Sequence, residues 1–220
     1  MSDEPTRIHV VRHGEVENPT GVLYGRLPGY HLSARGHEMA QRVADHLADE
    51  DLVVARTSPL ERARETMEPI AARHDGLEVS ADDRLIEADN LFAGQVFGRR
   101  NAPLLDPRNW WLLRNPLRPS WGEPYAEIAH RMLGALLDAA AATEAGRAAV
   151  LVSHQSPIWN LRRLVEGRRL ATLPTARECS LASVTTFHVL GGHVVDISYA
   201  EPAADLLGAD GNRAFSSSGH

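Results

Sequence analysis

The sequence has little of several features that mark other classes of protein. Cys179 is its one cysteine, so an intrachain disulfide and a cysteine-based zinc site are both excluded. It has no run of about 18 apolar residues, which excludes a membrane-spanning helix. The formal net charge of -6 lacks the basic excess that binding to nucleic-acid phosphates normally requires. We therefore expect a cytoplasmic protein that binds neither nucleic acid nor a membrane.

The two ends of the chain are polar. Residues 1–7 include Asp3 and Glu4 and have no apolar segment behind them, which differs from a secretory signal. Residues 209–220 are rich in glycine and serine, which predicts a flexible tail. The remaining length, residues 1–208, is enough for a single α/β domain with a sizeable core.

Short apolar runs alternate with helical periods along the chain. The runs predict strands at residues 8–11, 52–55, 77–79 and 149–152, and two more at 181–189 and 193–199 around the hairpin signal Gly191-Gly192. Helical periods lie at residues 39–47, 59–74 and about 125–146, and again from residue 157. Ser58 and Ser156 each precede a proline, so we expect two helix N-caps with proline at the first helical position. This order predicts a three-layer α/β/α fold with a mostly parallel central sheet and an antiparallel edge strand.

The segment at residues 96–121 follows neither the strand period nor the helix period. Its tryptophans and arginines are Trp110, Trp111, Trp121, Arg99, Arg100, Arg108, Arg114 and Arg118. Long irregular insertions in compact domains are often lids or binding loops, so we predict an inserted cap over the functional site. The alternative is a satellite hydrophobic cluster surrounded by solvated arginines.

Side chains that can bind an anion follow three of the predicted strands. Arg12 and His13 come directly after the first strand, Arg62 lies a turn or two beyond the second, and His154 follows the fourth. Parallel strands end at the same edge of a sheet, so these side chains can converge on one phosphate-sized volume. An arginine offers a planar fork of donors for phosphate, and a neutral imidazole offers a nucleophilic nitrogen. The pattern predicts phosphoryl transfer to His13, with no need for a metal ion or cofactor.

Five short motifs extend this pattern over most of the chain, up to Tyr199. In order, they are Arg12-His13-Gly14, residues 32–36 (LSARG), residues 58–66 (SPLERARET), residues 84–87 (RLIE) and residues 152–154 (VSH). With these motifs in this order, the chain resembles the histidine phosphatase superfamily, also called phosphoglycerate mutase-like, whose signature is an Arg-His-Gly tripeptide on the first strand.

The resemblance implies a phosphohistidine mechanism and assigns a role to each matching residue. His13 would attack phosphorus, while Arg12, Arg62 and His154 hold the phosphoryl oxygens. Glu87 would protonate the leaving oxygen and then help to activate the water that releases phosphate. A carboxylic acid is needed at that place because an alkoxide leaves poorly unless it is protonated.

Several positions differ from the family pattern. Asn18 lies one position before the family's usual asparagine, and Gln155 stands where glycine is common. We expect both side chains to contact the phosphate. Val16 replaces a common threonine, and the residues after Glu87 also differ, so Asp89 is an alternative proton donor.

Four functional hypotheses follow, and hydrolysis of a small phosphomonoester is the leading one. A phosphoglycerate mutase is second, because residues 96–121 do not resemble the longer basic and aromatic stretch of the cofactor-dependent mutases. A phospho-ligand-binding module with reduced turnover stays open because of the departures near Val16 and Glu87. A zinc-dependent hydrolase that uses His13 and His154 is the most remote. The sequence leaves the substrate undetermined, and the edge hairpin could pair between subunits as a homodimer.

Overall fold

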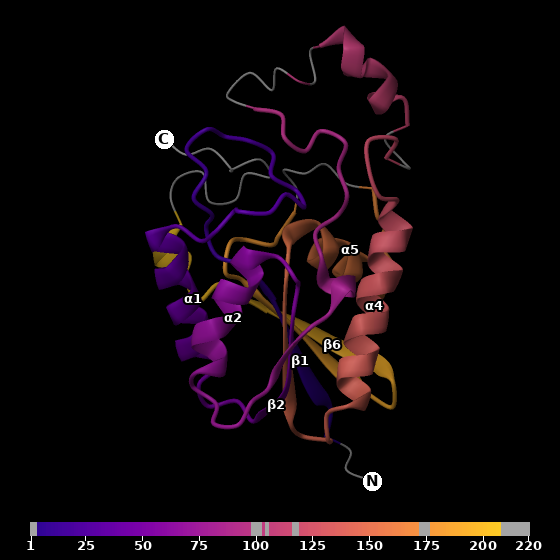
Figure 1. The fold of residues 1–220 in the computed structure, drawn as a ribbon. Helices are drawn as coiled ribbons and strands as arrows, with labels where there is room; N and C mark the ends of the chain where they lie inside the picture. The colour runs from indigo at the N-terminus through magenta and orange to yellow at the C-terminus, as the bar shows by residue number, and fades with distance from the viewer. Residues whose placement is uncertain (1–3, 98–102, 104–105, 116–118, 172–176, 208–220) are drawn as a thin grey trace.

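The computed structural model describes residues 4–97, 103, 106–115, 119–171 and 177–207, in which a six-stranded sheet lies between two helical layers (Figure 1). The strands are β1 (Thr6–Arg12), β2 (Leu52–Thr57), β3 (Val79–Ala81), β4 (Ala148–Ser153), β5 (Val184–Leu190) and β6 (His193–Ala200). Their order across the sheet is β3-β2-β4-β1-β5-β6. The first four of these strands are parallel, and β5 runs antiparallel to both of its neighbours. The predicted fold class is therefore confirmed, with the antiparallel pair at one edge.

Helices cover both faces of the sheet. On one face, α1 (Ala34–His46) and α2 (Glu61–Ala71) share a core with Val11 of β1. On the other face, α4 (Tyr125–Ala141) and α5 (Gln155–Val165) share a core with Val10. Successive residues of a strand point to opposite faces, so each apolar run of the sequence supplies both cores.

Both predicted helix starts are wrong by two residues. α2 begins at Glu61 with no side-chain cap, because the Ser58 hydroxyl is bonded to a histidine of the site rather than to the first turn. α5 begins at Gln155, earlier than the predicted start at Pro157. Proline is still tolerated there, because the backbone nitrogens of the first helical turn have no partner within the helix.

Other boundaries shift by a few residues for local reasons. The predicted strand at residues 181–189 begins only at Val184. Ala182 has a φ of 53°, which interrupts the extended backbone just before that point. α2 ends at Ala71 instead of near His74, and Gly76 then takes a φ of 76° in the turn that leads to β3.

The irregular segment at residues 96–121 is described in part, and it lies at the end of the molecule where the parallel strands finish (Figure 1). It includes a 3₁₀ helix, η2 (Pro107–Leu113). A small separate hydrophobic cluster contains Phe92, Phe97, Leu112, Leu23 and Trp121. Phe97, Leu112 and Trp121 of the segment join this cluster, whereas Trp110 and Trp111 are more than half exposed. The cap and the alternative, a satellite cluster with solvated arginines, both stay predictions.

Several sequence-based predictions for this region and for the tail fall outside the described residues. They concern Arg99, Arg100, Arg118 and residues 209–220.

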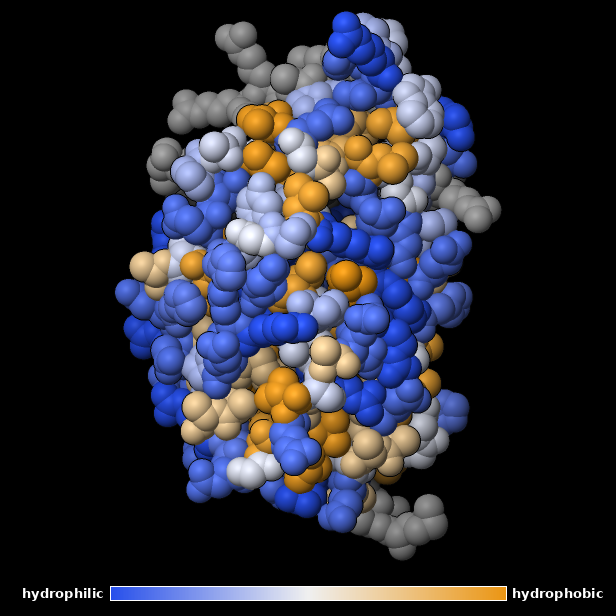
Figure 2. Space-filling model, in the orientation of Figure 1, coloured by the Kyte–Doolittle hydropathy of each residue, from blue (hydrophilic) through white to orange (hydrophobic). Residues whose placement is uncertain are grey.

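Apolar side chains gather on the surface at the upper end of the molecule (Figure 2). Among the exposed large apolar side chains, Leu91 and Val96 are each more than half exposed. Within the described ranges, no helix is long and apolar enough to cross a membrane.

Candidate active site

The turn after β1 places His13 in the interior, where its side chain is only 2% exposed. The backbone nitrogen of His13 donates to the carbonyl of Ser153 at 3.1 Å, which holds the turn against the end of β4. The next nitrogen, that of Gly14, donates to Thr66 Oγ1 of α2 at 3.1 Å. A Cβ on Gly14 would lie 2.5 Å from the carbonyl oxygen of Gly36, so only glycine lets this turn pack against the start of α1.

The hydrogen bond of the His13 ring defines its tautomer. Nδ1 lies 2.7 Å from the carbonyl oxygen of Gly14, which can only accept, so Nδ1 carries the proton. Burial, followed by the charges of Arg62 and Arg12, holds the pKa of His13 well below its usual range. The ring is therefore neutral at neutral pH, and Nε2 keeps the lone pair that a nucleophile needs.

Two arginines from different elements lie beside this ring. Arg62, in the first turn of α2, is fully buried and donates from Nη2 to the carbonyl oxygen of Gly25 at 2.7 Å. Its guanidinium carbon lies 4.7 Å from the centre of the Tyr24 ring. Arg12, the last residue of β1, donates from Nη1 to the carbonyl oxygen of Cys179 at 2.6 Å. Arg62 Nε and Nη1 and Arg12 Nε have no hydrogen-bond partner.

The second histidine, His154, directly precedes α5 and is fully buried. Its ring centre lies 5.1 Å from that of His13. Nε2 lies 2.8 Å from Ser58 Oγ, which also accepts from the backbone nitrogen of Leu60. The Ser58 hydroxyl can either donate to Nε2 or accept from it, while the other ring nitrogen, Nδ1, is buried without a partner. Burial, together with the charges of Arg62 and the neighbouring His13, holds the pKa of His154 well below its usual range.

These contacts leave four buried nitrogens without partners around the His13 ring. They are Arg12 Nε, Arg62 Nε, Arg62 Nη1 and His154 Nδ1. Buried donors in folded proteins nearly always have acceptors, because leaving one unpaired costs free energy. The four atoms come from β1, α2 and the start of α5, and buried nitrogens of this kind match what an anion with several oxygens requires.

Glu87 and Asp89, the two candidate proton donors, differ in their surroundings. Glu87 is half-buried, and its Oε1 accepts from the backbone nitrogen of Ala88 at 2.7 Å. Its charge acts on Tyr24 and Arg62. Asp89 is exposed, and its carboxylate accepts from the backbone nitrogen of the next residue. Of the two, Glu87 is the carboxylate that interacts with Arg62.

The structure gives Asn18 and Gln155 contacts within the protein. The Asn18 side chain closes its own loop, with Nδ2 donating to the Val22 carbonyl at 2.9 Å and Oδ1 accepting from the Val22 nitrogen at 3.1 Å. Gln155 Nε2 lies 3.4 Å from the carbonyl oxygen of Cys179, the same acceptor that Arg12 uses. Contact of either side chain with a phosphate stays a prediction.

Three residues of this region were not among the predicted site residues. Tyr24 lies under the Arg62 guanidinium, and Ser58 orients the ring of His154. Arg177 lies two residues before Cys179, and its buried Nε has no partner. Burial lowers the pKa of Arg177, while the charge of Glu87 acts in the opposite direction. No local pattern assigns these residues to the site, because Tyr24 and Ser58 contact residues far away in the sequence and Arg177 interacts with the distant Glu87 through charge.

The described residues contain no group of three or more histidine, cysteine, aspartate or glutamate side chains that could hold a metal ion.

A model of the histidine phosphatase superfamily, branch 1, matches residues 8–198 of the chain. This chain belongs to the histidine phosphatase superfamily. The resemblance of its sequence motifs to that family is therefore confirmed.

Named relatives of this histidine phosphatase include both curated proteins and solved structures. It is 55% identical over 201 residues to the uncharacterized protein Rv0525 of Mycobacterium tuberculosis, which covers 91% of this chain and 98% of the relative. It is 33% identical over 156 residues to phosphoserine phosphatase 1 of Hydrogenobacter thermophilus. That match covers 69% of this chain and 72% of the relative. The structure of mycobacterial glucosyl-3-phosphoglycerate phosphatase Rv2419c matches with a TM-score of 0.69 at 25% identity, covering 89% of this chain and 96% of that chain.

Proposed function

We propose that this histidine phosphatase hydrolyses a small phosphomonoester, without a metal ion, through a phosphohistidine at Nε2 of His13. One observation carries the proposal, namely a buried neutral imidazole beside four buried nitrogens that lack partners. A phosphoryl group has enough oxygens to accept hydrogen bonds from all four, and hydrogen bonds between charged groups are the strongest kind available.

The reaction has two steps that share one histidine and one carboxyl group. The lone pair of His13 Nε2 attacks phosphorus, the bond to the leaving oxygen breaks, and the protonated form of Glu87 gives that oxygen a proton and becomes a carboxylate. Arg12 and Arg62 lower the barrier because negative charge builds on the phosphoryl oxygens that they hold. Water then attacks the phosphohistidine, Glu87 accepts its proton, and phosphate leaves with His13 restored.

We propose further that the substrate carries a second negative group near the phosphate. Arg177 supports this, because its Nε is buried without a partner and it lies close in the chain to Cys179, the acceptor of the Arg12 bond. A carboxylate matches the planar fork of an arginine. The relatives named for phosphoserine and for glucosyl-3-phosphoglycerate point in the same direction, since both of these compounds carry a carboxylate.

Hydrolysis is preferred over mutase chemistry because these same relatives are named as phosphatases. A mutase would return the phosphoryl group from His13 to a second hydroxyl instead of to water. A coupled assay with 3-phosphoglycerate separates the two reactions, because only the mutase produces an isomeric phosphoglycerate without releasing phosphate.

The central test is the replacement His13→Ala. We expect it to abolish phosphate release from 4-nitrophenyl phosphate and to abolish the acid-labile, alkali-stable phosphoryl group that rapid quenching traps on the wild type. His37→Ala is the matched control, because His37 is exposed on α1 and should leave both measurements unchanged. Undiminished turnover of the His13 variant would refute the proposal, and phosphate binding without a trapped phosphohistidine would favour a binding module.

A further inference from the structure

The segment that carries Glu87 is held mainly by side chains from other parts of the chain. It follows the short 3₁₀ helix η1 (Asp83–Leu85) and has no helix or strand of its own. Arg131 Nη1 donates to the carbonyl oxygen of Arg84 at 2.5 Å, before Glu87 in the chain. Arg26 Nε donates to the carbonyl oxygen of Glu87 itself at 2.7 Å. Arg26 thus holds the backbone of the proposed proton donor directly, and Arg131 holds the backbone three residues before it.

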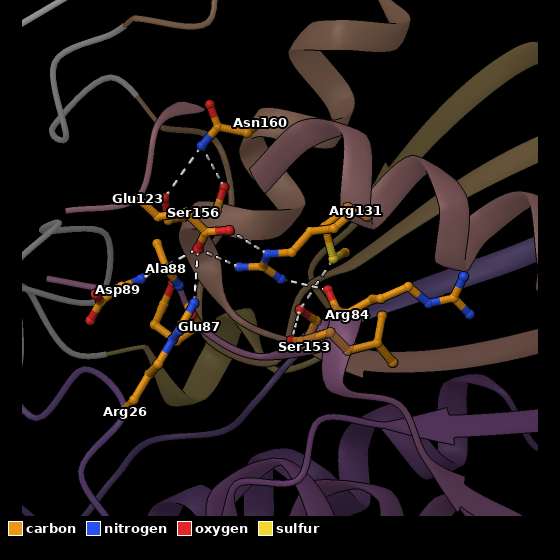
Figure 3. Close-up of polar contacts among 12 residues, drawn as sticks. Arg26, Arg84, Glu87, Ala88, Asp89, Glu123, Arg131, Ser153, Ser156 and Asn160 are labelled. Carbon is orange, nitrogen blue, oxygen red and sulfur yellow. Dashed lines mark hydrogen bonds and ion pairs between the residues drawn. The ribbon is translucent and has the colours of Figure 1, made fainter. Parts of the chain in front are cut away.

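Both of these arginines are held by one carboxylate, that of Glu123 (Figure 3). Glu123 Oε2 accepts from Arg26 Nη2 at 2.8 Å, and Oε1 accepts from Arg131 Nε at 2.8 Å. A second bond from Arg131 Nη2 reaches Oε2 at 3.1 Å. The Glu123 side chain is 15% exposed and that of Arg131 is 17% exposed, so this ion pair lies largely away from bulk water and restrains the Arg131 guanidinium more than a surface pair does. The Arg26 side chain is 36% exposed and lies at the edge of the same network.

The backbone of Glu123 adds a direct contact with the same segment. Its nitrogen donates to the carbonyl oxygen of Asp89 at 3.2 Å, and Gly122 pairs with Asn90 as an isolated bridge. A Cβ on Gly122 would lie 2.1 Å from the Asp89 carbonyl oxygen, so the segment at Gly122 and the segment at Asp89 pack backbone against backbone with no room for a side chain. Residues on both sides of Glu87 are therefore tied to Glu123.

Arg26 also connects the proton donor to the phosphate-binding side of the site. The residue before it, Gly25, accepts from Arg62 Nη2 at 2.7 Å, while Arg26 itself donates to Glu87 at 2.7 Å. Two adjacent residues therefore hold the anion-binding arginine and the acid segment. The separation between Arg62 and Glu87 depends on where Arg26 is held, and Glu123 holds it.

The charge of Glu123 is needed for this arrangement. Burial alone would raise its pKa, but the hydrogen bond and charge of Arg131, together with the charge of Arg26, hold the pKa of Glu123 below its usual range. The carboxylate is therefore ionised at neutral pH. An amide in its place keeps one acceptor oxygen but offers no negative charge to either guanidinium.

We propose that Glu123 is a positioning residue, which aligns Glu87 with the leaving oxygen by holding Arg26 and Arg131. This inference rests on the proposed function, in which Glu87 is the proton donor. It predicts a defect that depends on the leaving group. An alkyl alcohol needs a proton in order to leave, whereas 4-nitrophenolate is a stable anion and leaves without one.

The experiment compares kcat/KM for phosphoserine and for 4-nitrophenyl phosphate, because this ratio reports the phosphoryl-transfer step that forms the phosphohistidine. We expect Glu123→Gln to lower kcat/KM for phosphoserine by about 10- to 100-fold and that for 4-nitrophenyl phosphate by less than about threefold. Glu87→Gln should show the same selectivity with a larger loss. In the Glu87→Gln background, Glu123→Gln should cause no further loss, because the group that it positions is absent.

Two further variants keep the test decisive. Arg26→Met removes the link at a partly exposed side chain, so it gives the same selective loss even if Glu123→Gln folds poorly. Asp138→Asn is the matched control, because it breaks an exposed ion pair with the Arg84 side chain but no contact to the Glu87 backbone. Equal losses on both substrates, or a full additional loss in the Glu87→Gln background, would overturn the positioning role. Failure of the proposed function would be recognised separately, by turnover that survives His13→Ala.

Discussion

Replacing Arg62 by methionine should abolish turnover and yet leave the protein slightly more stable. Arg62 is fully buried, and two of its three guanidinium nitrogens lack a partner. Burial lowers the pKa of Arg62 from its usual value, and the nearby charge of Glu87 does not restore it. The side chain is therefore retained at a cost to the unliganded fold, which is expected where a charge serves an anionic ligand.

The size of the effect follows from the contacts of Arg62. A buried, charged donor without a partner costs about 2 kcal/mol, so removing two of them stabilises the fold by about 4 kcal/mol. The variant loses the bond to the Gly25 carbonyl, worth about 2 kcal/mol for a charged donor. It also loses the contact with the Tyr24 ring, worth about 1 kcal/mol. We expect the free energy of unfolding to rise by about 1 kcal/mol.

Urea unfolding with and without inorganic phosphate measures the stability of the variant and its affinity for phosphate, and phosphate release from 4-nitrophenyl phosphate measures its turnover. Phosphate at 100 times its dissociation constant should stabilise the wild type by about 2.7 kcal/mol and the Arg62→Met variant far less. Arg64→Met is the matched control, because Arg64 is exposed on the same helix, and both of its values should equal those of the wild type. A loss of more than about 2 kcal/mol in the variant, or equal stabilisation by phosphate, would refute the reasoning.

Three further predictions concern stability, packing and specificity. Burial lowers the pKa of His9 to about 4, while histidine in the unfolded chain titrates near 6.5. The unfolded state therefore binds the proton more readily, and the folded state loses stability as the pH falls from about 6.5 to about 4. His9→Asn should recover up to about 3 kcal/mol of unfolding free energy at about pH 4 in urea titrations. An unchanged pH dependence would contradict this. Gly122→Ala should destabilise the protein by more than about 2 kcal/mol in thermal unfolding, whereas Gly134→Ala, inside α4 with an ordinary 3.6 Å contact, should not destabilise it. Arg177→Met should raise KM for phosphoserine about tenfold and leave that for 4-nitrophenyl phosphate unchanged, and equal changes would exclude recognition of a second negative group.

Much of the fold could be predicted because its signals are local. Each apolar run, such as residues 149–152, is buried on both faces of the sheet and therefore reads as a continuous hydrophobic stretch. The order of strands and helices then implies parallel strands with their carboxyl ends at one edge. That edge brings together Arg12, Arg62 and His154, which are far apart in the sequence.

The helix starts could not be predicted in the same way, because the deciding partners are distant. The Ser58-Pro59 pattern is typical of an N-cap, but its hydroxyl bonds with His154, 96 residues away, and α2 begins later. At α5 the Ser156-Pro157 pattern also misleads, since proline is acceptable at any of the first helical positions. At α2, local propensity gave way to a contact within the site.

The sequence by itself determined the fold class, the family motifs and the residue types that can carry phosphoryl transfer, because these depend on burial patterns and on the chemistry of single residues. Only the tertiary structure decided the neutral state of His13, the unpaired nitrogens of Arg62 and the clamp that Glu123 forms on the Glu87 segment. These properties arise from desolvation and from hydrogen bonds between distant segments, and neither exists until the chain has folded.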